Sequence, residues 1–277
     1  MQEQVQLPNT RSLQISDLSD RFECVSGSMI GRNHVLAGKN NQDAFRVVRQ
    51  ERYIIAVVCD GCGSGKHSEV GAKLGTRMVI DAIADLLNHD LAISDREFWK
   101  AVQTNLLQKL KDFVAISNGD MEFVNDYLLF TIVGVLITPN ETVTFSMGDG
   151  AIAVNGKLNQ IPAYPDNAPP YLAYGLYRPD AVSFEIRDRL PTSEVESILI
   201  ATDGIDDLIA VATIGQFWQE DRYFKNPDAL RRKLAMLNRE ETKPDWQRRE
   251  LVKRSGALSD DTTIVVLRLD KSSRYQG

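Results

Sequence analysis

Aspartates stand at the ends of apolar runs at several points of this 277-residue chain. Asp60 directly follows the apolar run at 53–59 and opens a turn that holds three glycines in its next five residues. A single Asp-Gly pair at the end of a strand is commonly just a tight turn. The same setting recurs, however, at four more positions: Asp43, Asp149, Asp203 and Asp260. This repetition favours a shared site to which each strand end contributes one carboxylate.

Carboxylates that converge in this way need a cation. Two of them about 4 Å apart repel each other by roughly 1 to 4 kcal/mol, depending on the local dielectric, so an empty cluster is strained or partly protonated. Carboxylates and a backbone carbonyl such as that of Gly61 form an all-oxygen ligand set, which prefers Mg²⁺ or Mn²⁺ to zinc or copper. Two such ions would activate water and clamp a phosphoryl group for in-line attack.

Cys59 and Cys62 form a C-x-x-C pair that offers two other chemistries. A redox pair of the thioredoxin kind opens a helix, whereas this pair brackets an aspartate at the end of a strand. A zinc site needs two further ligands, and only His67 is close in the sequence. Both alternatives stay open, but they fit the pattern less well than an all-oxygen site does.

The strands that carry Asp43 and Asp60 are predicted to pair with each other. Asp43 precedes a β-rich run at 44–48 and Asp60 ends the run at 53–59, so only residues 49–52 connect the two runs. A connection this short indicates an antiparallel hairpin. In such a hairpin the start of the first strand lies beside the end of the second, so we expect Asp43 and Asp60 to be neighbours.

The remaining pattern predicts an α+β fold. Amphipathic helices are expected over 68–87, with Ser68 as the N-cap, and over 95–116, and shorter ones within 213–219 and 228–239. Strands are expected at 22–29, 127–137, 142–147, 151–154, 182–186, 195–202 and 262–269, with a loop at 31–43 and a charged segment at 240–254. Because the helices come in blocks rather than in strict alternation with strands, we expect antiparallel sheets with helices packed outside.

A single domain over residues 21–270 is expected, because the chain has neither repeats nor a low-complexity linker. Residues 1–20 are expected to form a loose N-terminal arm and residues 271–277 a tail. The stretch 161–174 holds four of the ten prolines and three tyrosines. It is too irregular for a helix or strand and too aromatic for a disordered linker, so we expect an ordered flap around 161–180.

The composition argues against several classes of partner. A net charge of -6 and a pI near 5.2 do not suit a nucleic-acid partner, which would need a basic face. No stretch approaches the roughly 18 to 20 apolar residues that span a bilayer, and the start of the chain lacks the features of a signal peptide. Three cysteines cannot form a disulfide framework. A cytoplasmic monomer that binds neither nucleic acid nor membrane is the expectation.

Five motifs together make the chain recognisable. They are Gln42-Asp43, Asp60-Gly61 with its glycine-rich turn, Gly148-Asp149-Gly150, the run at 201–207 and the run at 259–266. In this order and spacing they resemble the metal-dependent serine/threonine protein phosphatases of the PP2C type (the PPM family), in particular a bacterial-like subgroup with a Gly-x-x-His pattern. The likeness spans about residues 22–269. It implies a central β-sandwich of two antiparallel sheets flanked by helix pairs, with two Mn²⁺ or Mg²⁺ ions at one end.

The resemblance also implies roles for the aspartates, with Asp60 as the bridge between the two ions. The other ligands that it implies are the Gly61 carbonyl, Asp43 through water, Asp203, Asp260 and, for a third and weaker ion, Asp149 together with Asp203. The activity implied is hydrolysis of phosphoserine and phosphothreonine monoesters in phosphorylated proteins, by metal-activated water and without a phosphoenzyme. The stretch 161–174 falls where the family has its substrate-facing flap.

One departure from the family pattern concerns the grip on the phosphate. Many members have an arginine shortly before the Gln-Asp motif, whereas this chain has Gly38-Lys39 there. Arg32, His34 or Lys39 must therefore supply the positive contact, and we expect it from His34.

A second departure concerns the general acid. Eukaryotic members have a histidine directly after Asp-Gly, whereas this chain has Cys62, a poor acid for that role. Protonation of the leaving group would then fall to metal-bound water or to His67. The two departures leave an alternative open, in which the chain is a weakly active or inactive PP2C-like regulatory module that binds phosphoproteins.

Overall fold

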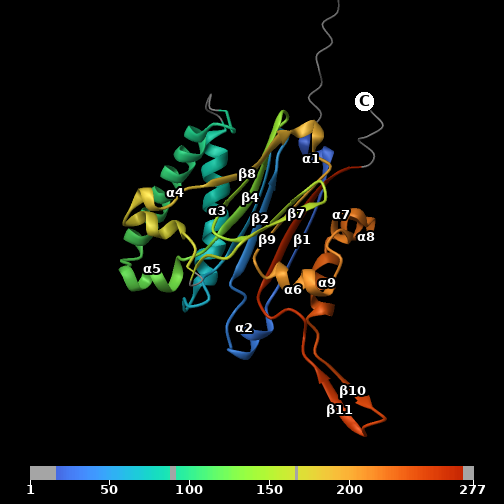
Figure 1. The fold of residues 1–277 in the computed structure, drawn as a ribbon. Coiled ribbons are helices and arrows are strands. Elements are labelled where there is room, and N and C mark those ends of the chain that lie inside the picture. The colour runs from blue at the N-terminus through green and yellow to red at the C-terminus, as the bar shows by residue number, and fades with distance from the viewer. Residues whose placement is uncertain (1–16, 88–91, 166–167, 271–277) are drawn as a thin grey trace, which may run out of the picture.

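Two five-stranded antiparallel sheets lie face to face in the computed structural model, which describes residues 17–87, 92–165 and 168–270 (Figure 1). The first sheet has the strand order β1 (Phe22–Met29), β12 (Thr262–Leu269), β9 (Ser197–Ala201), β6 (Gly150–Val154) and β7 (Lys157–Ile161). The second has the order β2 (Asp43–Arg49), β3 (Ile54–Asp60), β4 (Ile132–Ile137), β5 (Glu141–Met147) and β8 (Glu185–Pro191). The expected sandwich of two antiparallel sheets is confirmed.

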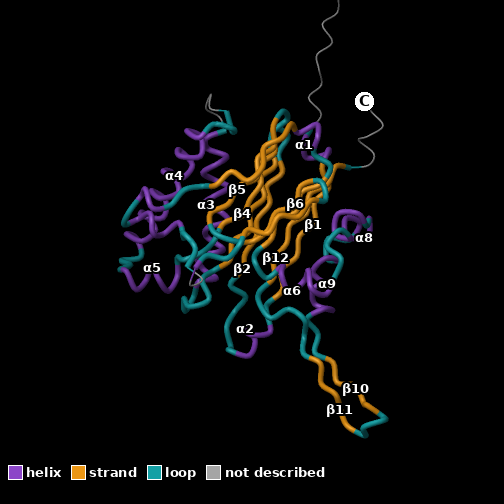
Figure 2. Tube along the Cα trace, in the orientation of Figure 1, coloured by secondary structure: helices purple, strands orange, loops and turns teal. Residues whose placement is uncertain are grey.

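Helices cover the outer side of each sheet and complete an α-β-β-α arrangement (Figure 2). On one side α3 (Ser68–Leu86) contacts the second sheet, and α4 (Arg96–Ile116) and α5 (Met121–Tyr127) pack against α3. On the other side the first sheet is covered by α6 (Ile205–Val211), α7 (Gln216–Gln219), α8 (Asp221–Lys225) and α9 (Ala229–Leu237). The α+β class with flanking helices is therefore as the sequence predicted.

Strand β3 shows why the apolar run at 53–59 has no polar face. Ile54, Ala56 and Val58 belong to the core between the two sheets, while Ile55 and Val57 belong to the core between the second sheet and its helices. Side chains of a strand alternate between faces, and both faces are buried here. The run is therefore apolar throughout. It ends at Asp60, which lies at the end of this buried strand.

Three local expectations differ from the structure. The N-cap of α3 is His67 rather than Ser68, and its side chain makes no capping hydrogen bond. Ser68 is instead buried in the first turn, which packs so closely on Gly61 that a Cβ at residue 61 would lie 2.7 Å from the Ser68 carbonyl oxygen. The strand expected from residue 127 begins only at Ile132. Residues up to Tyr127 belong instead to α5, which starts where the Asp120 side chain accepts the Phe123 N–H at 2.9 Å. The loop expected at 31–43 contains a short helix, α2 (Arg32–Leu36).

The strand expected at 182–186 is displaced along the chain, since β8 begins at Glu185. It is an edge strand that pairs only with β5, and its mixed polar and apolar sequence follows from that position. The segment 240–254, expected only to be charged, forms a hairpin of β10 (Glu241–Asp245) and β11 (Glu250–Arg254) that projects from the sandwich (Figure 1).

The expected arm at 1–20 falls mostly on residues outside the described part, and so does the expected tail at 271–277. A short helix, α1 (Leu18–Arg21), already begins within that arm, and the Leu18 side chain is buried. The expected flap contains two 3₁₀ helices, Leu172–Leu176 and Pro179–Ala181, and the first packs on α4. Among the described residues, no helix combines the length and apolarity that crossing a bilayer requires.

Candidate metal centre

Asp43 and Asp60 lie directly opposite each other in the β2–β3 hairpin. The register pairs Ile54 with Arg49 at the turn and continues without a shift to Asp60 opposite Asp43. The two strand ends are neighbours, as the short connection between them predicted. The hairpin thus places two carboxylates at the same end of the second sheet.

The first sheet brings two further aspartates to this end. Asp203 follows β9, and Asp260 precedes β12, which pairs with β9. A fifth, Asp149, lies in the tight turn between β5 of the second sheet and β6 of the first. Asp60, Asp149, Asp203 and Asp260 line one cavity of about 80 Å³ together with Gly61. The sandwich therefore collects strand ends that are far apart in the sequence.

The carboxylates influence each other strongly. Burial, followed by the charge of Asp43 and then those of Asp203 and Asp260, raises the pKa of Asp60 well above its ordinary value. Burial, together with the charges of Asp260 and Asp149, raises the pKa of Asp203 to about 7. Burial also raises the pKa of Asp149. Each shift indicates a negative charge that no cationic side chain balances.

Asp43 is the most informative member of the cluster. Its Oδ2 accepts a hydrogen bond from the Thr202 hydroxyl at 2.7 Å, and Thr202 is held in turn by the Thr263 N–H at 3.0 Å. Its Oδ1 is buried and has no hydrogen-bond partner. Burial, partly offset by the Thr202 hydrogen bond, raises the pKa of Asp43 to about 8. A buried carboxylate oxygen without a partner is costly, and a cation beside it would remove that cost.

The donor set fits hard divalent cations. The five carboxylates and the Gly61 carbonyl are all oxygen donors, as Mg²⁺ and Mn²⁺ require. Mutual repulsion among carboxylates and an unpartnered buried oxygen are the features expected of residues that bind a cation. Cys59, by contrast, is buried in the helix-side core, so the redox and zinc alternatives for the C-x-x-C pair find no support in the fold.

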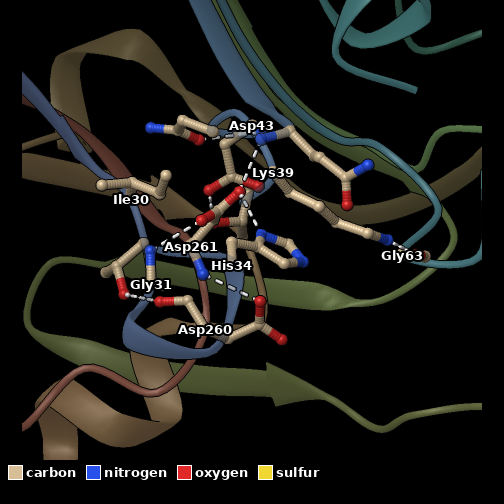
Figure 3. Close-up of polar contacts among 12 residues, drawn as sticks. Ile30, Gly31, His34, Lys39, Asp43, Gly63, Asp260 and Asp261 are labelled. Atoms are coloured by element: carbon tan, nitrogen blue, oxygen red, sulfur yellow. Dashed lines mark hydrogen bonds and ion pairs between the residues drawn. The ribbon is translucent and has the colours of Figure 1, made fainter. Parts of the chain in front are cut away.

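Asp261 is a buried carboxylate beside the cluster that the sequence pattern did not single out. Its Oδ1 accepts the Gly31 N–H at 2.6 Å, its Oδ2 accepts the Gln42 N–H at 2.5 Å, and His34 Nδ1 lies 2.9 Å from Oδ2 (Figure 3). Asp261 thereby ties the loop that leads to Asp43 to the strand that follows Asp260. The only sequence signal for the role of Asp261 is the pair of adjacent acids at 260–261. No sequence signal pointed to the role of Thr202.

The three basic side chains that were candidates for contacting the phosphate have different surroundings. Arg32 donates from Nη1 to the Gly256 carbonyl at 2.8 Å, and Lys39 donates from Nζ to the Gly63 carbonyl (Figure 3). His34 lines the cavity of the acidic cluster, and neither Arg32 nor Lys39 does. Ligand atoms of His34, Asp260 and Asp261 lie within 4.8 Å of one another, so His34 is also placed where it could contact a cation.

Cys62 and the flap form another wall of the cavity. Cys62 Sγ lies 3.1 Å from Ser64 Oγ, and Pro169 and Tyr171 of the flap complete the lining. Burial alone would raise the pKa of the Cys62 thiol, but hydrogen bonds from Ser64 and Tyr171 lower it overall. His67 does not line the cavity and packs instead near Tyr127, with ring centroids 5.0 Å apart.

A larger groove lies elsewhere among the described residues. It occupies about 770 Å³ beside α3 and α4, and its lining includes two lysines, Lys100 and Lys109, but only one carboxylate, Glu97. Size alone does not mark a site for chemistry. The carboxylate charges without a cationic partner lie in the small acidic cavity, not in this groove.

Comparisons with known proteins agree with this geometry. The model of the family described as Protein phosphatase 2C matches residues 30–253. The solved structure of a serine/threonine phosphatase from S. agalactiae is 14% identical, with a TM-score of 0.56, over 90% of this chain and 100% of that one. A bacterial serine phosphatase is also 14% identical, with a TM-score of 0.51, over 90% of this chain and 98% of that one.

A third structure is that of the catalytic domain of the serine threonine protein phosphatase PstP in complex with two manganese ions. It is 16% identical, with a TM-score of 0.50, over 90% of this chain and 99% of that one. At such identities the likeness to solved structures establishes a common fold. Among curated proteins, no sequence matches the chain.

Proposed function

Since this chain belongs to the protein phosphatase 2C family, we propose that its acidic cluster is the catalytic centre of a metal-dependent serine/threonine phosphatase. The resemblance noted in the sequence is thereby confirmed, and with it the class of the enzyme, a phosphoprotein phosphatase. The observation that carries the site assignment is the convergence of Asp43, Asp60, Asp203 and Asp260 with an unpartnered buried oxygen among them.

Two divalent ions, Mn²⁺ or Mg²⁺, would be held by Asp60 as the bridge, with the Gly61 carbonyl, Asp203 and Asp260, and with Asp43 through water. Asp149, which shares the cavity with Asp203, would contribute to a third and weaker site. The two manganese ions in the PstP structure support the number of ions. When bound, such ions act as Lewis acids toward phosphoryl oxygens and activate water for attack.

The protein's own side chains would position the reactants. Thr202 fixes one oxygen of Asp43, which would leave the other available to a cation or its bound water. Asp261 holds the His34 ring at the rim of the cavity, from where His34 would contact the phosphate. Tyr171 closes the cavity from the flap side and would limit the access of bulk water.

The substrate would be a phosphoserine or phosphothreonine in a phosphorylated protein. We further propose that the chain acts as a monomer in the cytoplasm, without a nucleic-acid or membrane partner. The net charge of -6 and three cysteines that are all free support this setting. The alternative, a regulatory module without turnover, is not favoured, because the carboxylates that the family uses are present at each matching position.

Replacement of Asp60 by asparagine tests the proposal. Asp60→Asn should abolish Mn²⁺-dependent hydrolysis of p-nitrophenyl phosphate, with a fall in kcat of at least about 10³-fold, because the bridge between the ions is lost. Asp112→Asn, an exposed aspartate on α4, is the matched control and should retain the activity of the unmodified chain.

Unchanged turnover in Asp60→Asn would contradict the assignment of Asp60. Calorimetry with Mn²⁺ should accompany the assay. Tight Mn²⁺ binding by the unmodified chain without any turnover would contradict the enzyme and support the regulatory module.

A further inference from the structure

The β10–β11 hairpin is the least explained element of the molecule. It stands away from the sandwich at the end where α2 lies (Figures 1 and 2), and every residue of its strands except Asp245 is exposed. Each strand of five residues extends roughly 17 Å. A two-stranded hairpin without a sheet or helix to pack on is marginally stable in water, so this one suits a surface that another molecule covers.

The base of the hairpin is fixed to the catalytic end of the molecule. Gly256, two residues after β11, accepts a hydrogen bond from Arg32 of α2 at 2.8 Å, and the Arg32 N–H donates to the Leu258 carbonyl at 2.9 Å. Asp207 then holds the following turn, accepting the Ser259 N–H at 2.6 Å and the Asp260 N–H at 3.2 Å. Hydrogen bonds to α2 and α6 therefore hold the segment that connects the hairpin to Asp260.

The tip of the hairpin exposes apolar surface. Trp246 has 84% of its surface exposed and Leu251 has 73%. Leu251 pairs with Pro244 across the strands, so these two side chains share one face of the hairpin. On the neighbouring α2, Leu36 is 79% exposed. Exposed apolar groups that lie together mark an interaction surface more often than scattered ones do.

The hairpin is also basic in an acidic chain. Residues 239–254 contain six basic side chains (Arg239, Lys243, Arg248, Arg249, Lys253, Arg254) and four acidic ones (Glu240, Glu241, Asp245, Glu250). All four acids take part in ion pairs within the hairpin. Arg249 has no such pair among the described residues and has a φ of 54°, a left-handed conformation that is unfavourable for arginine. Residues 239–254 thus carry a net charge of +2, and at the tip, where Arg248 pairs with both Asp245 and Glu250, Arg249 is the side chain left without an ion pair to any described residue.

The catalytic cavity itself cannot select a protein. Its volume of about 80 Å³ accommodates a phosphoryl group, and the adjoining acidic pocket of about 480 Å³, which shares Asp149, Asp203 and Asp260 with it, has room only for the residues next to that group. Discrimination among phosphoproteins must therefore come from contacts outside the cavity. A partner that is docked by a basic, apolar tip is one with an acidic surface and an apolar patch.

We propose that the hairpin of residues 240–254 is a docking arm that binds acidic phosphoprotein substrates while their phosphorylated residue occupies the metal centre. Trp246 and Leu251 supply the apolar anchor, and Arg249 supplies the charge. The inference rests on the proposed function, because it assigns the substrate class of that same site. The arm is a positioning element and takes no part in the chemical step.

The test uses the full chain with a double variant of the arm, Trp246→Ser with Arg249→Glu. A matched control is Ile116→Ser with Lys111→Glu on α4, because Ile116 is 83% exposed and Lys111 is exposed as well, far from the arm. Three probes are compared with Mn²⁺ present: phosphorylated casein as an acidic phosphoprotein, phosphorylated histone H1 as a basic one, and p-nitrophenyl phosphate.

The arm variant should raise KM for phosphorylated casein about tenfold with little change in kcat. Its kinetics with p-nitrophenyl phosphate and with phosphorylated histone H1 should stay within about twofold of the unmodified chain. For the unmodified chain, KM for casein should rise with salt, because salt screens the exposed charges, and in the arm variant this salt dependence should weaken. The control variant should behave like the unmodified chain throughout.

Unchanged casein kinetics in the arm variant, with normal turnover of p-nitrophenyl phosphate, would overturn the docking arm and leave the proposed function intact. Equal losses with casein and histone would overturn the preference for acidic partners. A change of oligomeric state in the arm variant, seen by size-exclusion chromatography with light scattering, would assign the arm to contacts between copies of this chain instead. No turnover of any probe by the unmodified chain would overturn both proposals.

Discussion

Two buried aspartates at the catalytic end differ in how their charge is satisfied. Asp261 accepts backbone N–H groups from Gly31 and Gln42, so its charge is used inside the protein to hold a loop. Asp43 has one oxygen bonded to Thr202 and the other without a partner. Because a buried acceptor without a donor is unfavourable, the difference separates a structural carboxylate from one that is available to a ligand. Sequence neighbours alone do not reveal this difference.

His34 is the residue whose proposed role can be separated most sharply from metal binding. His34→Gln should lower kcat/KM for p-nitrophenyl phosphate about tenfold, which corresponds to the loss of one charge-assisted hydrogen bond to the phosphate. The affinity for Mn²⁺, measured by calorimetry, should change by less than about threefold.

His67→Gln is the matched control, because His67 lies on the same side of the molecule but does not line the cavity. It should leave both measurements unchanged. A marked loss of Mn²⁺ affinity in His34→Gln would show instead that His34 ligates a cation, as its place beside Asp260 and Asp261 allows. An effect of His67→Gln on kcat would restore His67 as the general acid.

The β2–β3 hairpin determines the distance between the first two carboxylates of the centre. Its register runs unbroken from the turn to the Asp43–Asp60 pair. A slip of one residue in such a hairpin turns every side chain to the other face. Because both faces of β3 are buried in separate cores, the apolar side chains oppose any slip and so fix the acidic pair.

The turn between β9 and α6 is a second element on which the centre depends. A Cβ at Gly204 would lie 1.9 Å from the Asp261 carbonyl oxygen and 2.9 Å from Thr262 Oγ1. Gly204→Ala should therefore lower the free energy of unfolding by roughly 3 kcal/mol, because the backbone on one side of the contact must move. Equilibrium denaturation in urea measures the effect.

Gly63→Ala provides the comparison, since a Cβ at Gly63 would meet no atom within 4 Å. Its free energy of unfolding should stay within about 0.5 kcal/mol of that of the unmodified chain. Equal stabilities of the two alanine variants would mean that the close approach of the β9–α6 turn to the start of β12 does not constrain the fold.

At the scale of the whole molecule, the sandwich places strand ends from both sheets at the same end of the fold. The second sheet delivers Asp43 and Asp60, the first delivers Asp203 and Asp260, and the β5–β6 turn that crosses between the sheets delivers Asp149. Repulsion among these charges opposes folding of the metal-free chain. Binding of divalent cations should therefore stabilise the entire fold, not only the loops that hold the carboxylates.

Stabilisation by Mn²⁺ should be larger at about pH 8 than at about pH 6. Burial raises the pKa of Asp43 to about 8 and that of Asp203 to about 7, both above the ordinary value of 3.8. Such groups favour the metal-free fold below about pH 4, and their contribution is lost as the pH rises through 7 to 8. Metal binding requires the ionised forms, so its affinity rises over the same range.

Thermal unfolding with saturating Mn²⁺ and with a chelator measures this prediction. We expect Mn²⁺ to raise Tm by roughly 5 to 10 °C at about pH 8, given about 3 kcal/mol from a ligand at a hundred times its Kd, and by clearly less at about pH 6. Asp60→Asn should show no such rise at either pH. Equal increases of Tm at both pH values would mean that the carboxyls are already ionised in the metal-free chain.

Several features of the fold were predictable because they depend on short stretches of sequence. The helix expected over 95–116 is present as α4. Of the apolar stripe that its spacing indicates, Phe98, Val102, Leu106 and Leu110 are buried, and Phe113 is half-buried. Features that depend on contacts across the chain were not predictable. Helix α2 is bonded through Arg32 and Asn33 to the 258–259 carbonyls, and the edge strand β8 has its bounds set by its pairing with β5.

The sequence by itself determined which residues are candidates for the centre. Apolar runs that end in Asp-Gly mark strand ends, and their repetition pointed to the five aspartates and to oxygen ligands for a divalent ion. Only the tertiary structure decided which carboxylate is satisfied within the protein and which is not. Asp260 and Asp261 are adjacent in sequence, yet Asp260 lines the cavity while Asp261 is bonded to two backbone N–H groups. The partners of the two side chains come from distant segments, which no local pattern specifies.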